Sequence, residues 1–380
     1  MNRQPTYWKK YNLIFKCFSS KFLYEEIKKL TYKLGKPFDK KSKRGPKFKI
    51  PPEEYTAYEA FQIVTRNASF RDMEWDSDIL VDKHIDHGTL HHNFLKISYD
   101  YLSRLLDAIV HMLEDLLGNA IVYIMDSTGL STSVYEETLV KGKLTRRNKD
   151  FKLHVLSGYY PKEQITCMKG ALVSDKHVSD AEGATRLVRK HKTKGYHLGD
   201  RGFDAEKVYK EILENEGIPI IKPKKHKAKM FSYKAKGRAL YREHIYKELR
   251  GVIETGFGGL ENKGLIYTRC IREDSINKKG LLAAIRHNLM SYLKALVVTT
   301  IALFGIIRQT RGKYKAYIRE NIDKGKKIKD MVAGVNIEIE KLGDGRIIIT
   351  NLDTGKEIVK EEDMWFAWYA FHPDTLLYKK

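Results

Sequence analysis

Apolar side chains recur every three or four residues through the first third of the chain, which predicts α-helices. The first helix lies within residues 7–34, and a second is predicted over Pro51–Asn67, where Pro-Pro-Glu-Glu makes a favourable start. Ser69 can cap a third helix over Phe70–Leu80, and a fourth is predicted from near Gly88 to Leu117. This order is compatible with a helix-turn-helix unit, although any small helical bundle shows the same pattern.

Short apolar runs replace the long helical pattern from about residue 120 onward. The runs predicted as strands are 121–126, 152–160, 165–174, 195–200 and 218–224. The amphipathic segments predicted as helices are 180–192, 204–217, 243–260 and 278–308. A hairpin followed by alternating strands and helices predicts a mixed β-sheet with helices packed on it.

The last part of the chain alternates apolar and polar residues around glycine-containing turns. Val335–Val359 therefore predicts a small β meander, which the aromatic segment Met364–Phe371 follows. The uncharged stretch Ala295–Ile307 is shorter than the roughly 20 residues of a membrane span, so it predicts a buried core helix. Residues 1–10 are not followed by the apolar core of a signal peptide. We expect a soluble protein.

The net charge of the chain indicates which class of partner the protein binds. The chain carries 70 Lys and Arg against 48 Asp and Glu, a formal net charge of +22. Such an excess favours a polyanionic partner, most often nucleic acid. The basic residues gather in three runs, at 36–49, 141–149 and 222–238. With 42% apolar residues the chain can bury a core, which excludes wholesale disorder.

Cysteine and histidine patterns give little support to a disulfide or zinc framework. Cys17, Cys167 and Cys270 lie far apart, so a reducing cytosolic setting is expected. Four histidines near a predicted loop–helix junction suggest zinc: His84, His87, His91 and His92. No cysteine accompanies them, and we interpret them as polar residues on helix faces.

Three acidic residues stand where chemistry is expected. Asp126 in Met-Asp-Ser-Thr-Gly and Asp200 in Gly-Asp-Arg-Gly-Phe-Asp end two predicted strands, and strand ends are where α/β sheets place functional groups. Glu254 lies one turn after Arg250, beside the apolar stripe of helix 243–260. Each acid alone is an ordinary turn or surface residue. Together, three carboxylates repel unless a cation lies between them, and their oxygens suit Mg²⁺ or Mn²⁺.

These motifs, in this order, resemble the DDE transposases of bacterial and archaeal insertion sequences, whose catalytic core is RNase H-like. The resemblance covers roughly residues 45–295 and rests on the segments 125–129, 151–160, 172–188, 197–225 and 250–264. It implies that Asp126, Asp200 and Glu254 are a catalytic triad that binds two Mg²⁺ ions, for which Mn²⁺ can substitute.

The same resemblance implies that Arg250 contacts a DNA phosphate. Two departures concern the neighbouring positions. Tyr246 lies four residues before this arginine, where one branch of the family has a tyrosine three before. Glu261 stands where that branch has a lysine, and Lys263 follows two residues later.

The implied architecture is α/β: an RNase H-like mixed sheet flanked by helices, preceded by an all-helical, helix-turn-helix-like domain and followed by a small β extension. The expected segments are an N-terminal helix with a basic arm (1–50), a helical DNA-binding domain (51–118), the catalytic domain (119–310), and the β extension with its aromatic tail (311–380).

The implied function is that of a transposase that binds terminal inverted repeats, cleaves the strands and transfers them into target DNA. The expected partner is double-stranded DNA, held by a homodimer in a synaptic complex in the prokaryotic cytoplasm, associated with the nucleoid. The candidate DNA-contacting residues are Lys43, Arg44, Lys47, Arg146, Arg147, Arg201, Lys224, Lys225, Lys227, Lys229, Arg250 and Lys263. A flexible loop is expected over the third basic run, where Phe231 and Tyr233 could stack on an unpaired base.

Three alternatives stay open on the sequence. A metal-dependent DNA nuclease on the same fold would keep the three acids and lack strand transfer. A non-catalytic, transposase-derived DNA-binding protein would tolerate loss of an acid, and none is lost here. An RNA-binding protein is compatible with the net charge.

Overall fold

In the computed structural model the chain forms two compact units, Met1–Val298 and Thr299–Lys380. The residues that the structure describes are 18–39, 47–131, 137–140, 143–146, 151–225, 229, 232–262, 264–270, 272–332, 335–352, 355 and 357–360. Within these ranges the backbone alone is described for 137–140, 143–146, 250, 253–256, 258, 300–319, 330–332, 335 and 358–360. The four-segment division expected from the sequence stays a prediction.

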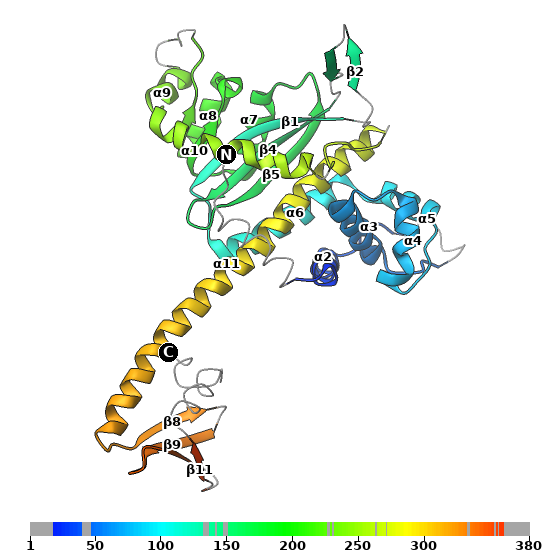
Figure 1. The fold of residues 1–380 in the computed structure, drawn as a ribbon. Coiled ribbons are helices and arrows are strands. Elements are labelled where there is room, and N and C mark those ends of the chain that lie inside the picture. Colours follow the sequence, from blue (N-terminus) through cyan, green and yellow to red (C-terminus); the bar gives the residue numbers. More distant parts are fainter. Residues whose placement is uncertain are drawn as a thin grey trace. The chain divides into compact units, whose positions relative to one another are not determined.

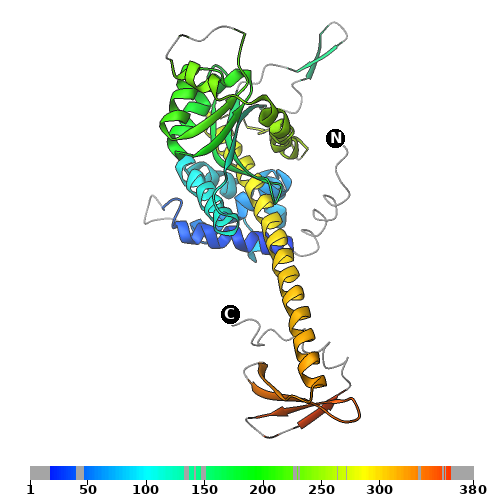
Figure 2. The ribbon, with the colours of Figure 1, turned by 90° about the vertical axis from the view of Figure 1, so that its left-hand side faces the viewer.

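In the part of the first unit that the structure describes, helices precede the sheet, and α2 to α5 gather to one side of it (Figures 1 and 2). These helices are α2 (Ser20–Leu34), α3 (Pro52–Arg66), α4 (Phe70–Val81), α5 (His87–Lys96) and α6 (Tyr99–Leu117). The prediction of a single helix from residue 88 to 117 is wrong. Ile97 is extended, and the Ser98 hydroxyl accepts the amide of Tyr101 at 3.0 Å, so a new helix starts there.

A five-stranded sheet forms the centre of the first unit. Its strands are β1 (Val122–Leu130), β4 (Phe151–Tyr160), β5 (Ile165–Asp175), β6 (Gly195–Gly199) and β7 (Gly217–Ile221). Their order is β5-β4-β1-β6-β7, with β4 antiparallel to β1 and β5, and β6 and β7 parallel to β1. A separate pair, β2 (Glu137–Val140) and β3 (Lys143–Arg146), lies between β1 and β4 in the chain. The RNase H-like mixed sheet expected from the sequence is confirmed.

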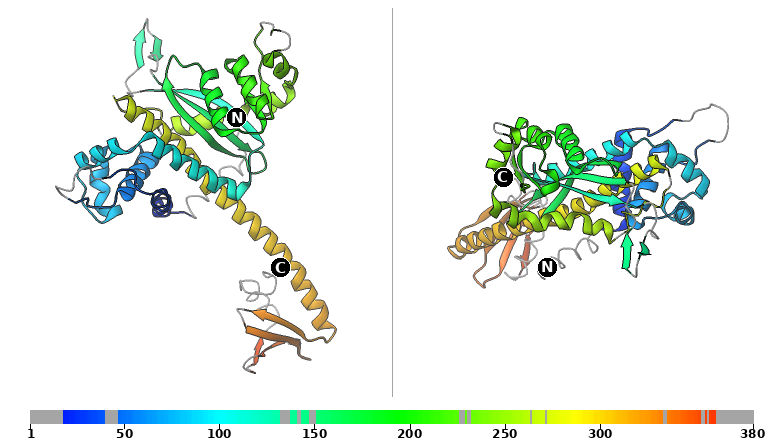
Figure 3. Two further views of the ribbon diagram at one scale, coloured as in Figure 1. Left: turned by 180° about the vertical axis from the view of Figure 1, so that it is seen from behind. Right: turned by 90° about the horizontal axis from the view of Figure 1, so that it is seen from above.

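Helices cover both faces of this sheet, which lies between them when it is viewed from above (Figure 3). Side chains of α7 (Asp180–His191), α8 (Glu206–Glu214) and the second half of α6 pack on the face formed by Tyr123 and Met125. Helix α10 (Glu243–Glu261) packs on the opposite face, against Ile124 and Leu198. The start of α11 (Glu273–Asp323) packs on that same face at β4 and β5. Between these helices lie η1 (Arg201–Phe203) and α9 (Tyr233–Ala239).

The described part of the second unit contains a small antiparallel sheet that confirms the predicted meander. Its strands are β8 (Ile328–Val332), β9 (Val335–Lys341), β10 (Ile347–Asn351) and β11 (Glu357–Lys360), in the order β11-β10-β9-β8. Ile337, Ile339, Ile347 and Ile349 are buried, as the alternating pattern requires. The aromatic segment 364–371 lies outside the described residues.

Residues Glu273–Thr299 of α11 are long and apolar enough to span a membrane by composition alone. In the structure 61% of that apolar window is buried inside the protein, which is typical of a core helix. The side chains of most of the stretch 295–307 are not described.

Glu59 of α3 is an acid in the core of the helical region. Its side chain is 0% exposed, and neither carboxylate oxygen has a hydrogen-bond partner among the described residues. Burial raises the pKa of Glu59 well above its ordinary value, although the nearby ammonium of Lys278 opposes this. The folded protein therefore keeps this carboxyl protonated at a pH at which the unfolded chain releases the proton.

Replacing Glu59 by glutamine is therefore expected to flatten the pH dependence of stability. A raised folded-state pKa gives stability that is fully present below the unfolded pKa of about 4.3 and is lost as the pH rises towards the folded pKa. Urea midpoints at about pH 5 and pH 8 should differ less for Glu59→Gln than for the wild type. Glu53→Gln, in the first turn of the same helix, should behave like the wild type. An equal pH dependence in Glu59→Gln and wild type would contradict the assignment.

Candidate active site

The register of two parallel strands brings Asp126 and Asp200 together. β1 and β6 pair through Ile124 and Leu198, and the same register continued by two residues sets Asp126 opposite Asp200. Neighbouring strands lie about 4.8 Å apart. Ile124 and Leu198 pack in one apolar cluster with residues of α10, so this alternation points Asp126 to the face that α10 covers.

Asp126 does not end its strand as the sequence pattern predicted. β1 continues to Leu130 because β4 pairs with it in antiparallel register as far as Leu130 and Phe151. Only the parallel pairing with β6 stops before Asp126, at Ile124. The Asp126 carboxylate therefore lies on a part of β1 that pairs with β4 on one side and extends beyond the pairing with β6 on the other.

A small pocket lies between Asp126 and helix α10. Its wall includes Val155 and Ser157 from β4, and Val252 and Phe257 from α10. Residue 254 lies on the helix between the last two, so the backbone of the predicted third acid passes next to this pocket. The side chains of Glu254, Arg250 and Lys263 are outside the description, and their roles stay predictions.

The two aspartates are oriented by backbone amides and repel each other. Asp126 Oδ1 accepts the amide of Ser127 at 2.8 Å, and Asp200 Oδ1 accepts the amide of Gly202 at 2.6 Å. Burial raises the pKa of Asp126 to about 7; the Ser127 amide opposes this, while the charges of Asp200 and Asp180 add to it. A cation between the two carboxylates would reduce their electrostatic repulsion, and hard oxygen donors fit a divalent ion such as Mg²⁺ or Mn²⁺.

A second polar group beside this pair escaped the sequence analysis. Asp180, the first residue of α7, accepts the Ser127 hydroxyl at 2.7 Å and the Lys152 ammonium at 3.2 Å on the same oxygen. The buried ring of His154 lies 4.0 Å from that oxygen. In the sequence Asp180 reads only as an acid in the first turn of a helix capped by Ser179, so no local signal distinguishes it.

Asp204 anchors the third basic run next to Asp200. Its side chain is 0% exposed, forms a two-pronged ion pair with Arg238, and accepts the Tyr209 hydroxyl at 3.0 Å and the Lys224 amide at 2.9 Å. Lys234 lies 3.4 Å from the same carboxylate. Two cations of the run therefore neutralise a buried acid.

The prediction of a flexible loop through residues 222–238 is wrong for its last part, which forms α9. Tyr233 is held in place, because its hydroxyl donates to Glu214 at 3.0 Å and its amide to Glu206 at 2.8 Å, and its stacking on a base stays a prediction. Phe231 lies outside the described residues. The segment packs beside α8 because the ring of Tyr233 joins the apolar cluster that includes residues of α8, and Arg238 pairs with Asp204 just before that helix.

The other candidate DNA-contacting residues fall into two groups. Those whose side chains the structure describes are exposed or half-buried: Lys47, Arg201, Lys224, Lys225 and Lys229. Those outside the description, or described by backbone only, are Lys43, Arg44, Arg146, Arg147 and Lys227. Arg201 directly follows Asp200 in the chain, so one cation of the first group lies next to the pair of Asp126 and Asp200. Their contacts with DNA stay predictions.

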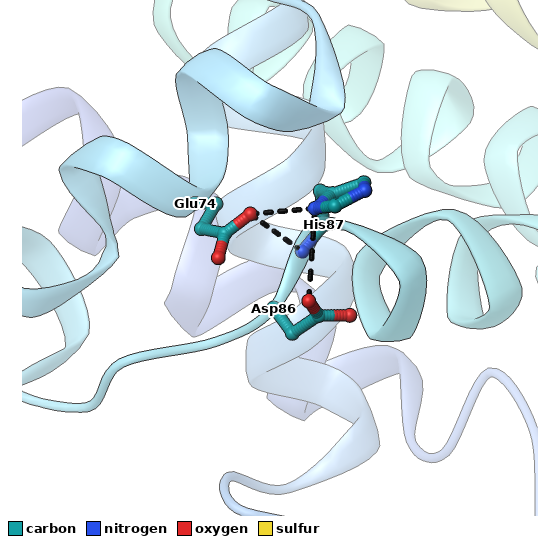
Figure 4. A group of neighbouring side chains, drawn as sticks. All are labelled: Glu74, Asp86 and His87. Atoms are coloured by element: carbon teal, nitrogen blue, oxygen red, sulfur yellow. Dashed lines mark hydrogen bonds and ion pairs between the residues drawn. The ribbon is translucent and has the colours of Figure 1, made fainter.

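The histidine-rich segment holds an ion-pair cluster (Figure 4). In the described part of the chain, one group of His, Cys, Asp or Glu side chains has three possible metal-ligand atoms within 4.8 Å of one another: Glu74, Asp86 and His87. The ring and amide of His87 lie 2.6 and 3.2 Å from one Glu74 oxygen, and Asp86 caps α5. The ring of His91 packs on Phe70. His87, His91 and His92 lie on α5, as predicted, whereas His84 lies between α4 and α5, so the interpretation as a helix-face residue is wrong for His84.

Comparison with known proteins adds one match. Residues 117–289 match the family model described as the transposase DDE domain. The matched range begins at the last residue of α6 and ends within α11, so it contains β1, β6 and α10 with all three predicted acids. No curated protein matches the chain.

Proposed function

We propose, from the premise that residues 117–289 form a transposase DDE domain, that this chain cleaves the ends of an insertion sequence and joins them to target DNA. One observation carries the proposal: Asp126 and Asp200 each lie two residues beyond the last β1–β6 pair, near enough for the charge of Asp200 to raise the pKa of Asp126, and Asp126 borders the pocket whose other wall is α10 with residue 254. A domain of this family acts on DNA by phosphoryl transfer.

DDE transposases use divalent metal ions, and for this chain we infer two Mg²⁺ ions, with Mn²⁺ as a substitute. Asp126, Asp200 and Glu254 would hold them. Such ions, when bound, activate the nucleophile and stabilise the leaving oxygen of an in-line displacement. The chain itself orients two of the carboxylates through the amides of Ser127 and Gly202, and Val252 and Phe257 place an apolar wall beside Asp126.

The proposed reaction has two displacements at phosphorus. In the first, a water oxygen bonds to the phosphorus at the element end, the 3′ oxygen leaves with the bonding electron pair, and the proton released by the water balances the one this oxygen takes up. In the second, the freed 3′-hydroxyl attacks a phosphorus of the target strand, whose own 3′ oxygen leaves. Both steps need the same in-line geometry, which is why one centre can serve both.

Basic residues around the centre would hold the DNA backbone. Arg201, Lys224 and Lys225 follow the two parallel strands β6 and β7 at the edge of Asp200. Cations at this edge can neutralise phosphates on either side of the cleaved bond. We propose that the N-terminal helices recognise the terminal inverted repeats, and that two copies hold two ends in a synaptic complex in the prokaryotic cytoplasm, without a membrane.

The test uses the full-length chain with duplexes made from the DNA that flanks its gene, in the presence of Mg²⁺. Uncut ends should be nicked at the element boundary, and pre-cut ends with a free 3′-hydroxyl should join to a target plasmid. Duplexes with scrambled ends are the control and should react much less. Cleavage without joining would replace the transposase proposal by a nuclease, and the absence of both reactions would overturn it.

A further inference from the structure

Asp180 accepts a hydrogen bond from one of the residues whose amides orient the paired aspartates, Ser127, and lies beside the other, Gly202. Ser127 donates its amide to Asp126 and its hydroxyl to Asp180, at 2.8 and 2.7 Å. Gly202 donates its amide to Asp200, and the position that a Cβ would take at Gly202 lies 2.9 Å from Asp200 Oδ1 and 3.7 Å from Asp180 Oδ2. One carboxylate of Asp180 thus lies against the two backbone segments that carry these amides.

This contact comes from the opposite face of the sheet. Ser127 follows Asp126 on β1, so its side chain points to the face that α7 covers, where its register partner His154 also lies. Asp180 begins α7 on that face, and its charge still reaches Asp126, whose pKa it helps to raise. Asp180 therefore lies next to the proposed centre on the face of the sheet opposite to the one that α10 covers.

The packing of α7 on β4 holds Asp180 in place. A Cβ at Gly183 would lie 2.4 Å from the ring of His154, so the helix approaches the strand more closely than any other residue would allow. His154 is 1% exposed and its Nε2 is bonded to Ser174 at 2.8 Å. Its Nδ1 has no hydrogen-bond partner among the described residues and lies 4.0 Å from Asp180 Oδ1. Lys152 fixes the same oxygen from the neighbouring strand position.

We propose that Asp180 is a positioning residue for strand cleavage: it holds Ser127 and the Gly202 turn so that the carboxylates of Asp126 and Asp200 converge. This inference rests on the proposed function. Asp180 does not touch the reacting atoms in this role. Its effect passes through the hydroxyl of Ser127 and through contact with the turn that follows Asp200.

Three substitutions test the role. Asp180→Ala removes the acceptor and should lower the cleavage rate by about 10–100-fold, the usual effect of losing a group that orients metal ligands. Asp180→Asn keeps an oxygen that can accept the Ser127 hydroxyl, so it should retain more activity than the alanine variant. Ser127→Ala removes the other half of the link, and the double variant Ser127→Ala/Asp180→Ala should be less impaired than two independent effects predict.

Two further measurements separate positioning from general damage. Mn²⁺ binding to the DNA-free protein, followed by calorimetry, should weaken in Asp180→Ala, while the affinity for end DNA and the urea midpoint stay close to the wild type. Glu182→Gln is the matched control, because Glu182 lies in the first turn of the same helix and pairs with Arg186 and Lys207 instead. It should bind Mn²⁺ and cleave like the wild type.

The two proposals fail in different ways. If the wild type does not cleave end DNA, the proposed function falls. If the wild type cleaves and Asp180→Ala cleaves equally fast with unchanged Mn²⁺ binding, only the role of Asp180 is overturned. Strictly additive effects of Ser127→Ala and Asp180→Ala would also overturn it, because the hydroxyl would then not transmit the effect.

Discussion

Asp126→Asn is expected to abolish strand cleavage, lowering the rate by about 10³-fold or more, while end-DNA binding stays nearly unchanged. Asparagine keeps the shape of the side chain but lacks the charge that binds a divalent ion. Asp200→Asn should behave in the same way, since the β1–β6 register sets the two acids opposite each other. Cleavage of labelled end duplexes and gel-shift binding measure the two effects separately.

The same variant should gain stability in metal-free buffer above neutral pH. The folded-state pKa of Asp126 is raised to about 7, so its stabilising contribution is present below the unfolded pKa of about 3.9 and is lost as the pH rises through 7. Removing the charge removes this loss. Thermal unfolding near pH 8 with a chelator should show a higher midpoint for Asp126→Asn than for the wild type.

A combined loss of cleavage and gain of stability distinguishes a functional acid from a structural one. Asp175→Asn is the control, because Asp175 is an exposed acid at the end of β5 in the same sheet. It should change neither quantity much. Wild-type cleavage by Asp126→Asn or Asp200→Asn would remove the basis for the assigned centre.

Asp204→Asn is expected to lower the free energy of unfolding by about 3 kcal/mol, because it leaves Arg238 and Lys234 in a half-buried site without their negative partner. Burial alone would raise the pKa of Asp204, but hydrogen bonds from Arg238, Lys224 and Tyr209 outweigh it and hold the pKa at about 2. Urea unfolding at neutral pH measures the loss.

The pH dependence of the wild type follows from the same shift. A depressed pKa gives stability that is present above the unfolded pKa of about 3.9 and is lost as the pH falls through about 2, so this contribution should disappear in that acidic window. Adding Arg238→Met to Asp204→Asn should recover part of the lost stability, because it removes a cation that has lost the charge of Asp204. The exposed pair of Lys194 and Glu216 supplies the control, and Glu216→Gln should change stability little. An unchanged midpoint in Asp204→Asn would contradict the anchoring role.

Patterns that are local in the chain predicted most of the elements correctly. The apolar runs at 152–160 and 165–174 and the amphipathic segment 180–192 correspond closely to β4, β5 and α7. Alternation and helical spacing follow from the backbone geometry of each element, so they are visible before any tertiary contact forms. The break at Ser98 is also a local signal, because a serine that can cap a helix stands inside a long apolar pattern.

Elements that depend on distant partners were predicted less well. β1 continues past Asp126 because β4 pairs with it, and the sequence of residues 126–130 alone does not indicate that pairing. The short helix α9 looks like a lysine-rich loop in the sequence, and it docks because Asp204 takes up Arg238 and Lys234. A charge run shows how many cations are present, but a buried acid elsewhere decides which of them face solvent.

By itself the sequence determined the order of strands and helices, the excess of positive charge and the succession of Asp126, Asp200 and Glu254, because each of these is written in neighbouring residues. Only the tertiary structure decided that Asp126 and Asp200 share one edge of the sheet, since a register between strands more than 70 residues apart is a property of pairing. It also decided that Asp180 supports them from the other face. That arrangement joins the start of α7 to Ser127 within β1 and to the turn that follows β6, and no spacing along the chain indicates it.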